Sequence, residues 1–487
     1  MRNSDNNRWS NIVFYMKEEI WKVSFYGIAA ILTGILAFFI MYNAGWIIGD
    51  DAIVISHTGW GHFFNPADTV TPSSGRFFPL AYTVYNILPL LGLTSVNAHF
   101  ALQTIVFVLF CIISIWAARK AIDAKQLAWH EYLLIFSAGM VCIARAYNNF
   151  LDAYSTVWVD YFLVMLWVLC CYYVHECQSF VAMTIGLLSV TWLTYCLETN
   201  FVFPLAYGIA GLIFIRENAT KLEKAYHWSL VSVGVIFLLL YFFICYLHIE
   251  EAYDGSHGVE STIIGNAIKM FIAQKVLWVV LILLCWRAYH IVIKKDEFEF
   301  WDTMLLTGCA YCCGCAVLKL NWVLYYSLAS LFMIPAIVHY LHKYVGSKWA
   351  LMIMLALALF TFRKVLSYIK TNQNDRQETA KIISILTTYY HNGICIYWYA
   401  PEDEREWDFH LDQREWQYVC TQTLFAWHVE EECYKFPKIK EFEGESGIYI
   451  LPKENNELFP EYNSSIISKG EVLKEDGRIP LSVVRIE

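Results

Sequence analysis

The chain has 487 residues, of which 58% are hydrophobic and only 16% are charged, and its mean hydropathy is +0.43. A soluble protein of this length cannot bury that much apolar surface, so the composition predicts a polytopic α-helical membrane protein. The formal net charge is −9, and the segment from Lys370 onward, with 13 Lys/Arg against 22 Asp/Glu, accounts for all of it. This balance argues against nucleic acid as a partner and against a basic surface docked on anionic lipid.

Apolar runs long enough to cross a bilayer recur along the first 369 residues, since a spanning helix needs about 20 apolar residues. The first 22 residues are polar and mixed, so we expect no cleavable signal peptide. We expect about 11 spans, at 23–48, 98–118, 128–147, 157–174, 180–197, 201–215, 227–247, 269–291, 302–318, 322–341 and 349–367. One further segment, Phe77 to Leu93, is short and carries Pro79 and Pro89, so we expect it to lie in the interface or to re-enter.

The Lys and Arg residues predict the orientation of these spans through the positive-inside rule. If Phe77–Leu93 does not cross, the basic residues gather on one side, in the N-terminal segment and at 119–125, 216–224, 287–295 and 342–348. If it does cross, every basic loop after the first span lands outside. The charges therefore predict a cytoplasmic N-terminus, an outer loop at 49–97 and an extracytoplasmic C-terminus.

The residues from 370 to 487 differ from the membrane domain, 1–369, and we expect them to form a small extracytoplasmic α/β domain. Apolar residues at helical spacing predict a helix over Glu378–Tyr390, with Gly393 as its cap. We also expect a strand at 394–399, a helix at 412–422, and strands at 447–451 and 481–486. About 115 residues are enough for a modest core.

Under this topology, the polar residues that carry no topological signal gather at the outer ends of the spans. Ionisable groups at membrane depth are functional candidates by default, so we expect these residues to face one shared cavity. They are Asp50, Asp51, His57 and Arg76 in the first outer loop, Arg145, Asn149, Asp152 and Asp160 around the second, Glu198 in the next turn, and Lys319 near a later outer end.

The acidic pair in Gly49-Asp50-Asp51, directly after the first span, suits general-base chemistry. A carboxylate held ionised beside a sugar hydroxyl can take its proton, while a second acid orients the first, binds the acceptor or holds a metal. Arg76 and Arg145 suit the opposite role, because a guanidinium binds phosphate through two hydrogen bonds and stabilises charge on a leaving phosphate. For Arg76, the simpler interpretation is an interfacial anchor.

Other sequence patterns are weaker indications of a functional site. Four cysteines, at 309, 312, 313 and 315, have the spacing of a metal cluster, but they fall in one expected span, where no more than two could point one way. We interpret them as packing residues. The sequence has no Gly-rich phosphate loop, nucleophile elbow or zinc-helix motif, which argues against ATPases, serine hydrolases and zincins.

This layout resembles the GT-C superfamily of integral-membrane glycosyltransferases. Its members have a first span, a long outer loop that opens with an acidic pair, interfacial helices in that loop, and many further spans. Here the resemblance rests on Gly49-Asp50-Asp51, the interfacial stretches Ala52–Asn65 and Phe77–Leu93, the number of spans and the outward tail. The chain is similar to the bacterial members that modify lipopolysaccharide or other cell-envelope polysaccharides with a sugar carried on undecaprenyl phosphate.

The resemblance implies an inverting transfer of a hexosyl or pentosyl group from a polyprenyl-phosphate donor. The acceptor would be a glycan, glycolipid or protein at the outer face of a bacterial inner membrane. Asp50 would be the catalytic base and Asp51 its partner. Candidates beside the acceptor are Asp152 and Asp160, and candidates on the donor phosphate are Arg76, Arg145 and Lys319.

This chain departs from the usual pattern of the family in two places. Many relatives have Asp-Glu where this chain has Asp-Asp, and the loop 249–260, where some relatives place a phosphate-binding cation, has only His257. The resemblance favours no metal, although adjacent acids can bind Mg²⁺ or Mn²⁺.

Two other functions would use the same substrates. A transporter or flippase for lipid-linked sugars usually shows a repeated half and interrupted helices near the midplane, and this sequence has no internal repeat. A glycan polymerase or ligase usually relies on Arg and His in a large outer loop, whereas the prominent early feature here is acidic. Both rank below the glycosyltransferase.

Overall fold

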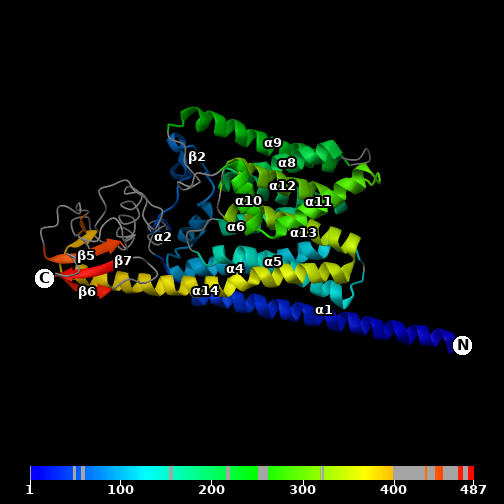
Figure 1. Ribbon diagram of the computed structural model, residues 1–487, viewed down its shortest axis with the longest axis horizontal. Coiled ribbons are helices and arrows are strands. Elements are labelled where there is room, and N and C mark those ends of the chain that lie inside the picture. The colour runs from blue at the N-terminus through cyan, green and yellow to red at the C-terminus, as the bar shows by residue number, and fades with distance from the viewer. Residues whose placement is uncertain are drawn as a thin grey trace.

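The computed structural model describes the chain except residues 1, 48–50, 56–60, 125, 153–156, 215–219, 251–261, 319, 321–322, 399–433, 436–444, 453–469 and 475–480. A bundle of long helices is followed by a small sheet beyond one end (Figure 1). Among the described residues, eight helices are long and apolar enough to cross a membrane, and one bent pair would make a ninth. The predicted polytopic helical fold is therefore confirmed.

Every expected span contains a helix. The long helices are α1 (Arg2–Tyr42), α4 (Val96–Lys120), α5 (Trp129–Phe150), α6 (Val157–Cys177), α9 (Lys221–Ile244), α12 (Phe300–Val317), α13 (Val323–Val345) and α14 (Ser347–His391). Two further apolar helices, α7 (Phe180–Cys196) and α8 (Val202–Phe214), are shorter. The 13 residues of α8 extend about 20 Å, against a hydrocarbon core about 30 Å thick.

The expected span at 269–291 is a bent pair instead of one helix. α10 (Ile263–Ala273) and α11 (Val276–Val292) meet at an angle of 106°. Gln274 at the corner is fully buried, donates to Ser327 Oγ (3.3 Å) and accepts from Ser330 Oγ (3.4 Å) on α13. Because a buried amide needs hydrogen-bond partners, these two bonds stabilise the corner. The hydropathy of the sequence does not reveal the bend, since both helices of the pair are apolar.

The segment Phe77–Leu93 forms no spanning helix, in agreement with the prediction. It contains the end of β2 (Arg76–Phe77), the 3-10 helix η4 (Thr83–Asn86) and the four-residue helix α3 (Ile87–Leu90). Asn86 ties this segment to the earlier part of the loop, because its side chain accepts from the Phe64 N–H (2.8 Å) and donates to the Phe64 carbonyl (3.0 Å). The remaining short elements of the loop are α2 (Asp51–Val54), η2 (Pro66–Thr69), β1 (Val70–Thr71), which pairs antiparallel with β2, and η3 (Pro72–Ser74).

The longest helix, α14, has 45 residues and joins the expected last span to the expected tail helix without a break (Figure 1). No Gly or Pro lies within it, and glycines with positive φ, Gly346 (+80°) and Gly393 (+73°), stand just outside its two ends. The division expected at residue 370 falls inside this helix, and the independence of the two parts stays a prediction. α14 packs along α5, so it carries side chains from the membrane part into the outer part of the bundle.

The C-terminal strands form one five-stranded sheet in the order β4-β3-β5-β7-β6. β3 is parallel to β4 and β5, whereas β5 and β6 are antiparallel to β7. The strands are β3 (Ile396–Trp398), β4 (Tyr434–Lys435), β5 (Gly447–Pro452), β6 (Glu471–Lys474) and β7 (Leu481–Ile486). The strands predicted at 394–399, 447–451 and 481–486 are confirmed, and the helix predicted at 412–422 lies outside the described residues.

The loops between the helices lie at two opposite ends of the bundle. At the end that we call the basic end, the His339 ring contacts the Ala121 carbonyl (3.0 Å) and the Glu299 carboxylate (3.2 Å), and Lys343 also contacts Glu299 (2.5 Å). The predicted inner stretches 119–125 and 342–348 therefore lie at the same end of the bundle. At the opposite end, Glu198 contacts Arg76 (2.7 Å), and the Glu250 N–H donates to the Ser73 carbonyl (2.9 Å). The predicted inner and outer loops thus gather at opposite ends, and which end faces the cytoplasm stays a prediction.

Candidate active site

Asp51 lies buried directly after the first span. It is the first residue of α2 and is 3% exposed. Its Oδ2 accepts a hydrogen bond from the Ile47 N–H (2.8 Å), and the free N–H groups of a helix's first turn favour a negative charge at this position. The carboxylate is therefore fixed against the segment that follows α1. The predicted base, Asp50, and the predicted ligand His57 lie outside the described residues.

Arg376, on α14, is the cation of this site. Its guanidinium interacts electrostatically with Asp51 and Asp152, and with its neighbour Asp375. The side chain is 7% exposed, and its Cζ lies 4.5 Å from the centre of the Phe100 ring. A Cβ at Gly45 would lie 3.3 Å from the Arg376 Cδ, so the backbone after the first span approaches this side chain closely.

The Arg376 guanidinium has hydrogen-bonding capacity left over. Its Nη2 donates to the Leu151 carbonyl, whereas Nε and Nη1 have no hydrogen-bond partner within the described part of the chain. A buried donor that makes no hydrogen bond costs free energy, and an arginine carries five N–H groups in a rigid fork. The open positions of this fork fit an anionic ligand such as a phosphate group.

Tyr85 and Gln103 complete what we call the Asp51–Arg376 cluster, which comprises Asp51, Tyr85, Gln103, Asp152 and Arg376. Burial raises the pKa of the Tyr85 hydroxyl well above its ordinary value, and the negative charges of nearby groups, including both aspartates, add to this shift. Tyr85 therefore stays protonated. Gln103 on α4 donates to the Asp152 carbonyl (2.8 Å) and ties this segment to the helix. The cluster combines two carboxylates, one guanidinium and a neutral hydroxyl.

Arg145 and Asn149 both lie on α5, the helix that ends just before Asp152 of this cluster. Arg145, on α5, lies near Tyr161 on α6 and Tyr368 on α14, and its Nε and Nη2 have no hydrogen-bond partner among the residues that the structure describes. One turn later, Asn149 donates to the Tyr161 hydroxyl (2.9 Å). Tyr368 and Arg376 are eight residues apart on α14, which corresponds to about 12 Å along the axis. A second guanidinium with buried nitrogens thus lies nearer the start of α14 than Arg376 does.

Arg76 and Glu198 form a separate group. Arg76 Nε donates to Glu198 Oε1 (2.7 Å), and the same oxygen accepts from the Phe77 N–H (3.2 Å). The Arg76 Cζ also lies 4.6 Å from the centre of the Phe78 ring. These contacts fasten β2 to the turn between α7 and α8. The geometry fits the interpretation of Arg76 as an anchor better than that of a phosphate ligand.

Asp160 belongs to a third group, in the interior between α6, α8 and α12. It is 1% exposed, and its Oδ2 accepts from Asn200 Nδ2 (3.3 Å). Asn200 in turn accepts from the Tyr311 hydroxyl (3.2 Å). Of the two acids expected near the acceptor, the structure brings Asp152 to Asp51 and places Asp160 elsewhere. Lys319 lies outside the described residues.

The sequence analysis missed Arg376 and Tyr85. Arg376 falls in a segment that its charge assigned to the soluble tail, and the signal that could have found it is the uninterrupted helical sequence from 347 to 391. Tyr85 is one of many aromatic residues in an interfacial segment, and no signal in the sequence sets it apart.

No group of three or more His, Cys, Asp or Glu side chains is placed to hold a metal ion among the described residues. The four cysteines of α12 are free thiols, of which Cys312 and Cys315 are buried and Cys313 is exposed. They therefore point to different sides of the helix.

No protein-family model and no curated protein matches the sequence. The structure is similar to a crystal structure of ArnT from Cupriavidus metallidurans bound to undecaprenyl phosphate. That similarity covers 95% of this chain and 97% of the other, at 10% sequence identity and a TM-score of 0.48.

Proposed function

We propose that this protein is an integral-membrane glycosyltransferase of the GT-C type. It moves a sugar from a polyprenyl-phosphate donor to a glycan, glycolipid or protein acceptor at the outer face of a bacterial inner membrane. The observation that carries the proposal is the Asp51–Arg376 cluster, where a buried carboxylate lies near a buried guanidinium with open donor positions. Transfer of a sugar from a phosphate needs both groups, a base for the acceptor and a cation for the leaving phosphate.

The reaction is a single displacement at the anomeric carbon. The acceptor oxygen attacks from the side opposite the phosphate, the new C–O bond forms, and the bond from the anomeric carbon to the phosphate oxygen breaks. The electron pair of that bond goes to the phosphate, and the hydroxyl proton goes to a carboxylate. We assign the proton to Asp50 and an orienting role to Asp51, next to it in the chain. Attack from the opposite side inverts the configuration.

Arg376 is our first candidate for the donor phosphate. Its Nε and Nη1 face no protein acceptor in the described part of the chain, and a guanidinium can hold two phosphate oxygens at once. Arg145 is the second candidate, since two of its nitrogens also lack described partners. Arg76 ranks below both because Glu198 already neutralises it. Lys319 remains a sequence-based candidate.

The two rival functions make different predictions from this geometry. A transporter binds its substrate near the midplane between repeated halves, whereas the Asp51–Arg376 cluster lies where α1 ends and α4 begins. A polymerase or ligase would act on a diphosphate-linked glycan. The purified protein in lipid nanodiscs should therefore be incubated with polyprenyl-phosphate and polyprenyl-diphosphate sugars.

Release of polyprenyl monophosphate with transfer of the sugar supports the proposal. Release of a diphosphate supports the polymerase or ligase, and movement of intact donor without release supports the transporter. Asp50→Asn should lower the rate of transfer at least about 100-fold while the protein stays folded. Glu250→Gln is the matched control, because Glu250 is an exposed carboxylate beside the loop that carries Arg76, and it should keep wild-type activity.

A further inference from the structure

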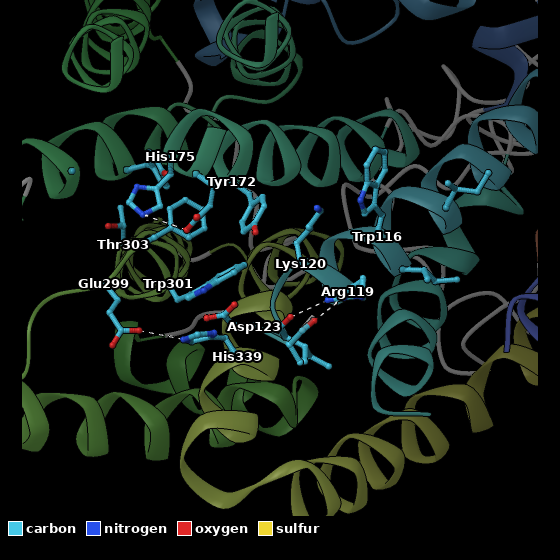
Figure 2. A pocket seen from close by; sticks show the side chains of 18 of the residues that line it. Trp116, Arg119, Lys120, Asp123, Tyr172, His175, Glu299, Trp301, Thr303 and His339 are labelled. Carbon is cyan, nitrogen blue, oxygen red and sulfur yellow. Dashed lines mark hydrogen bonds and ion pairs between the residues drawn. The ribbon is translucent and has the colours of Figure 1, made fainter. Parts of the chain in front are cut away.

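A cavity of about 1220 Å³ lies at the basic end of the bundle (Figure 2). Its lining comes from α1, α4, α6, α8, α9 and α12, with His339 of α13. Gln103 of α4 belongs to the Asp51–Arg376 cluster, whereas Lys120 of the same helix lines the cavity. The two residues are 17 positions apart, which corresponds to about 25 Å along the helix. The cavity is therefore distinct from the candidate active site.

One wall of the cavity is apolar and opens towards the bilayer. Ala30 and Gly34 of α1 line this part of the cavity together with Ile112 and Trp116 of α4. Ile112 is 54% exposed, and Trp116 is 45% exposed. In a helix that crosses a membrane, large exposed apolar side chains face lipid rather than water. A lipid chain can therefore enter the cavity sideways between the helices.

The rim of the cavity at the end of α4 carries charges of both signs. Lys120 Nζ lies 5.6 Å and 5.1 Å from the ring centres of Tyr172 and Tyr173, and it has no carboxylate partner in the described ranges. Asp123 is exposed on the same rim and forms no ion pair or hydrogen bond with the residues that the structure describes. Figure 2 shows both side chains at the cavity, Lys120 above Asp123.

The other charged groups of the lining are already engaged. Glu223 contacts the His175 ring (2.7 Å), and Glu299 contacts the His339 ring (3.2 Å). Arg119 donates to the Ile122 carbonyl (3.0 Å) and the Ala124 carbonyl (2.9 Å), which shapes the loop around Asp123. Glu176 lies 3.9 Å from the other nitrogen of the His175 ring. Among the described lining residues, Lys120 and Asp123 are therefore the charged groups that remain for a ligand.

We propose that this cavity binds a zwitterionic phospholipid whose headgroup ends in a primary ammonium, of the phosphatidylethanolamine class. Its phosphate lies at Lys120, its ammonium at Asp123, and an acyl chain along the apolar wall of α1 and α4. A headgroup of both signs satisfies both uncommitted side chains. A primary ammonium donates hydrogen bonds to a carboxylate, which a quaternary ammonium cannot do. A purely anionic headgroup leaves Asp123 without a partner.

The test is lipid binding to the purified full-length protein, measured by native mass spectrometry. Phosphatidylethanolamine, phosphatidylcholine and phosphatidylglycerol with identical chains are each titrated into the delipidated protein. We expect one tight site for phosphatidylethanolamine, about tenfold tighter than for the other two, as charge-assisted hydrogen bonds allow. Lys120→Gln should weaken this binding about tenfold. Lys348→Gln, at an exposed lysine of the same end outside the cavity lining, should leave it unchanged.

A second variant tests the chain-binding wall without touching a charge. Gly34→Trp should fold, because a Cβ at Gly34 meets no atom within 4 Å, and its ring would occupy the lining. We expect it to lose the tight site, whereas Gly27→Trp, on the same helix and equally open but outside the lining, should keep it. Equal affinity for the three headgroups, or wild-type affinity in both Lys120→Gln and Gly34→Trp, overturns the proposal. Glycosyl transfer is not part of this readout, so its failure would leave the assignment of the cavity unaffected.

Discussion

Arg376, late in the last long helix, interacts electrostatically with Asp51, in the loop that follows the first one. This interaction links the first and last long helices of the bundle. It depends on α14 continuing well beyond the length that a span needs, because Arg376 lies past the expected end of that span at residue 367. The bilayer-crossing helix thus supplies the site with its cation.

Removing this cation should damage donor binding. We expect Arg376→Ala to lower kcat/KM for the polyprenyl-phosphate sugar by about 10- to 100-fold, because hydrogen bonds to charged groups contribute about 1.5–3 kcal/mol. Arg376→Lys should recover only part of this loss, since an ammonium cannot bind two oxygens as a fork does. Steady-state kinetics with a short-chain donor measure both effects. Arg363→Ala, at an exposed position of the same helix, is the control. Wild-type donor kinetics in Arg376→Ala would remove Arg376 from the site.

The acidic pair should separate into two roles. Asp50→Asn should lower kcat by about 10²- to 10⁴-fold, as expected for loss of a general base. Asp51→Asn keeps the shape of the buried side chain that accepts from Ile47, and we expect a smaller fall in kcat together with a changed pH profile. Rate measurements across pH at saturating donor distinguish the two. If Asp51→Asn proves the more damaging of the pair, the base is Asp51.

Arg76 and Glu198 should behave as a structural pair. Arg76→Ala and Glu198→Ala should each destabilise the protein, and the double variant should be about as destabilised as either single one, with a coupling energy of about 0.5–3 kcal/mol. Unfolding of all four proteins in mild detergent gives this cycle. The KM for the donor should change less than about threefold in Arg76→Ala. A large, selective rise in that KM would return Arg76 to the phosphate site.

At the basic end, Arg287 should be essential for stability and dispensable for chemistry. It is 2% exposed and donates to both carboxylate oxygens of Asp302, through Nε and Nη2 at 2.7 Å each. Removing one partner of a buried pair costs about 3–5 kcal/mol, so Arg287→Ala should unfold at a much lower temperature. Lys294→Ala, an exposed residue near the same loop, should not. Transfer activity measured below the unfolding temperature should be retained.

Glu299 gives this end an acid-sensitive contact. Although burial opposes ionisation, hydrogen bonds from His339 and Lys343, with the charges of Lys343 and Arg287, lower the pKa of Glu299 from 4.5 to about 2. A carboxyl whose pKa is depressed on folding contributes stability above its unfolded pKa, and loses it as pH falls. The wild type should therefore lose stability between about pH 4.5 and pH 2, more steeply than Glu299→Gln. Thermal unfolding at pH 5 and pH 3 tests this, and parallel curves for the two proteins would contradict it.

Much of the membrane fold follows from local sequence. Hydropathy correctly predicts a helix in every expected span. The two prolines of Phe77–Leu93 correctly predict that this segment forms no spanning helix. The basic residues divide the loops into two groups, and the structure places the two groups at opposite ends of the bundle. These properties depend on composition along a short window, which is why one sequence suffices to predict them.

The tertiary structure alone decides which polar residues meet. Asp51 could be predicted as a site residue from its place after the first span, but its neighbour Arg376 comes from the far end of the chain. The same holds for the corner at Gln274, which two serines of α13 stabilise, and for the cation of Arg76, which Glu198 neutralises. Each of these partners is distant in sequence and ordinary in type. Their pairing depends on how long helices pack side by side, and the periodicity of a single helix carries no information about its neighbours.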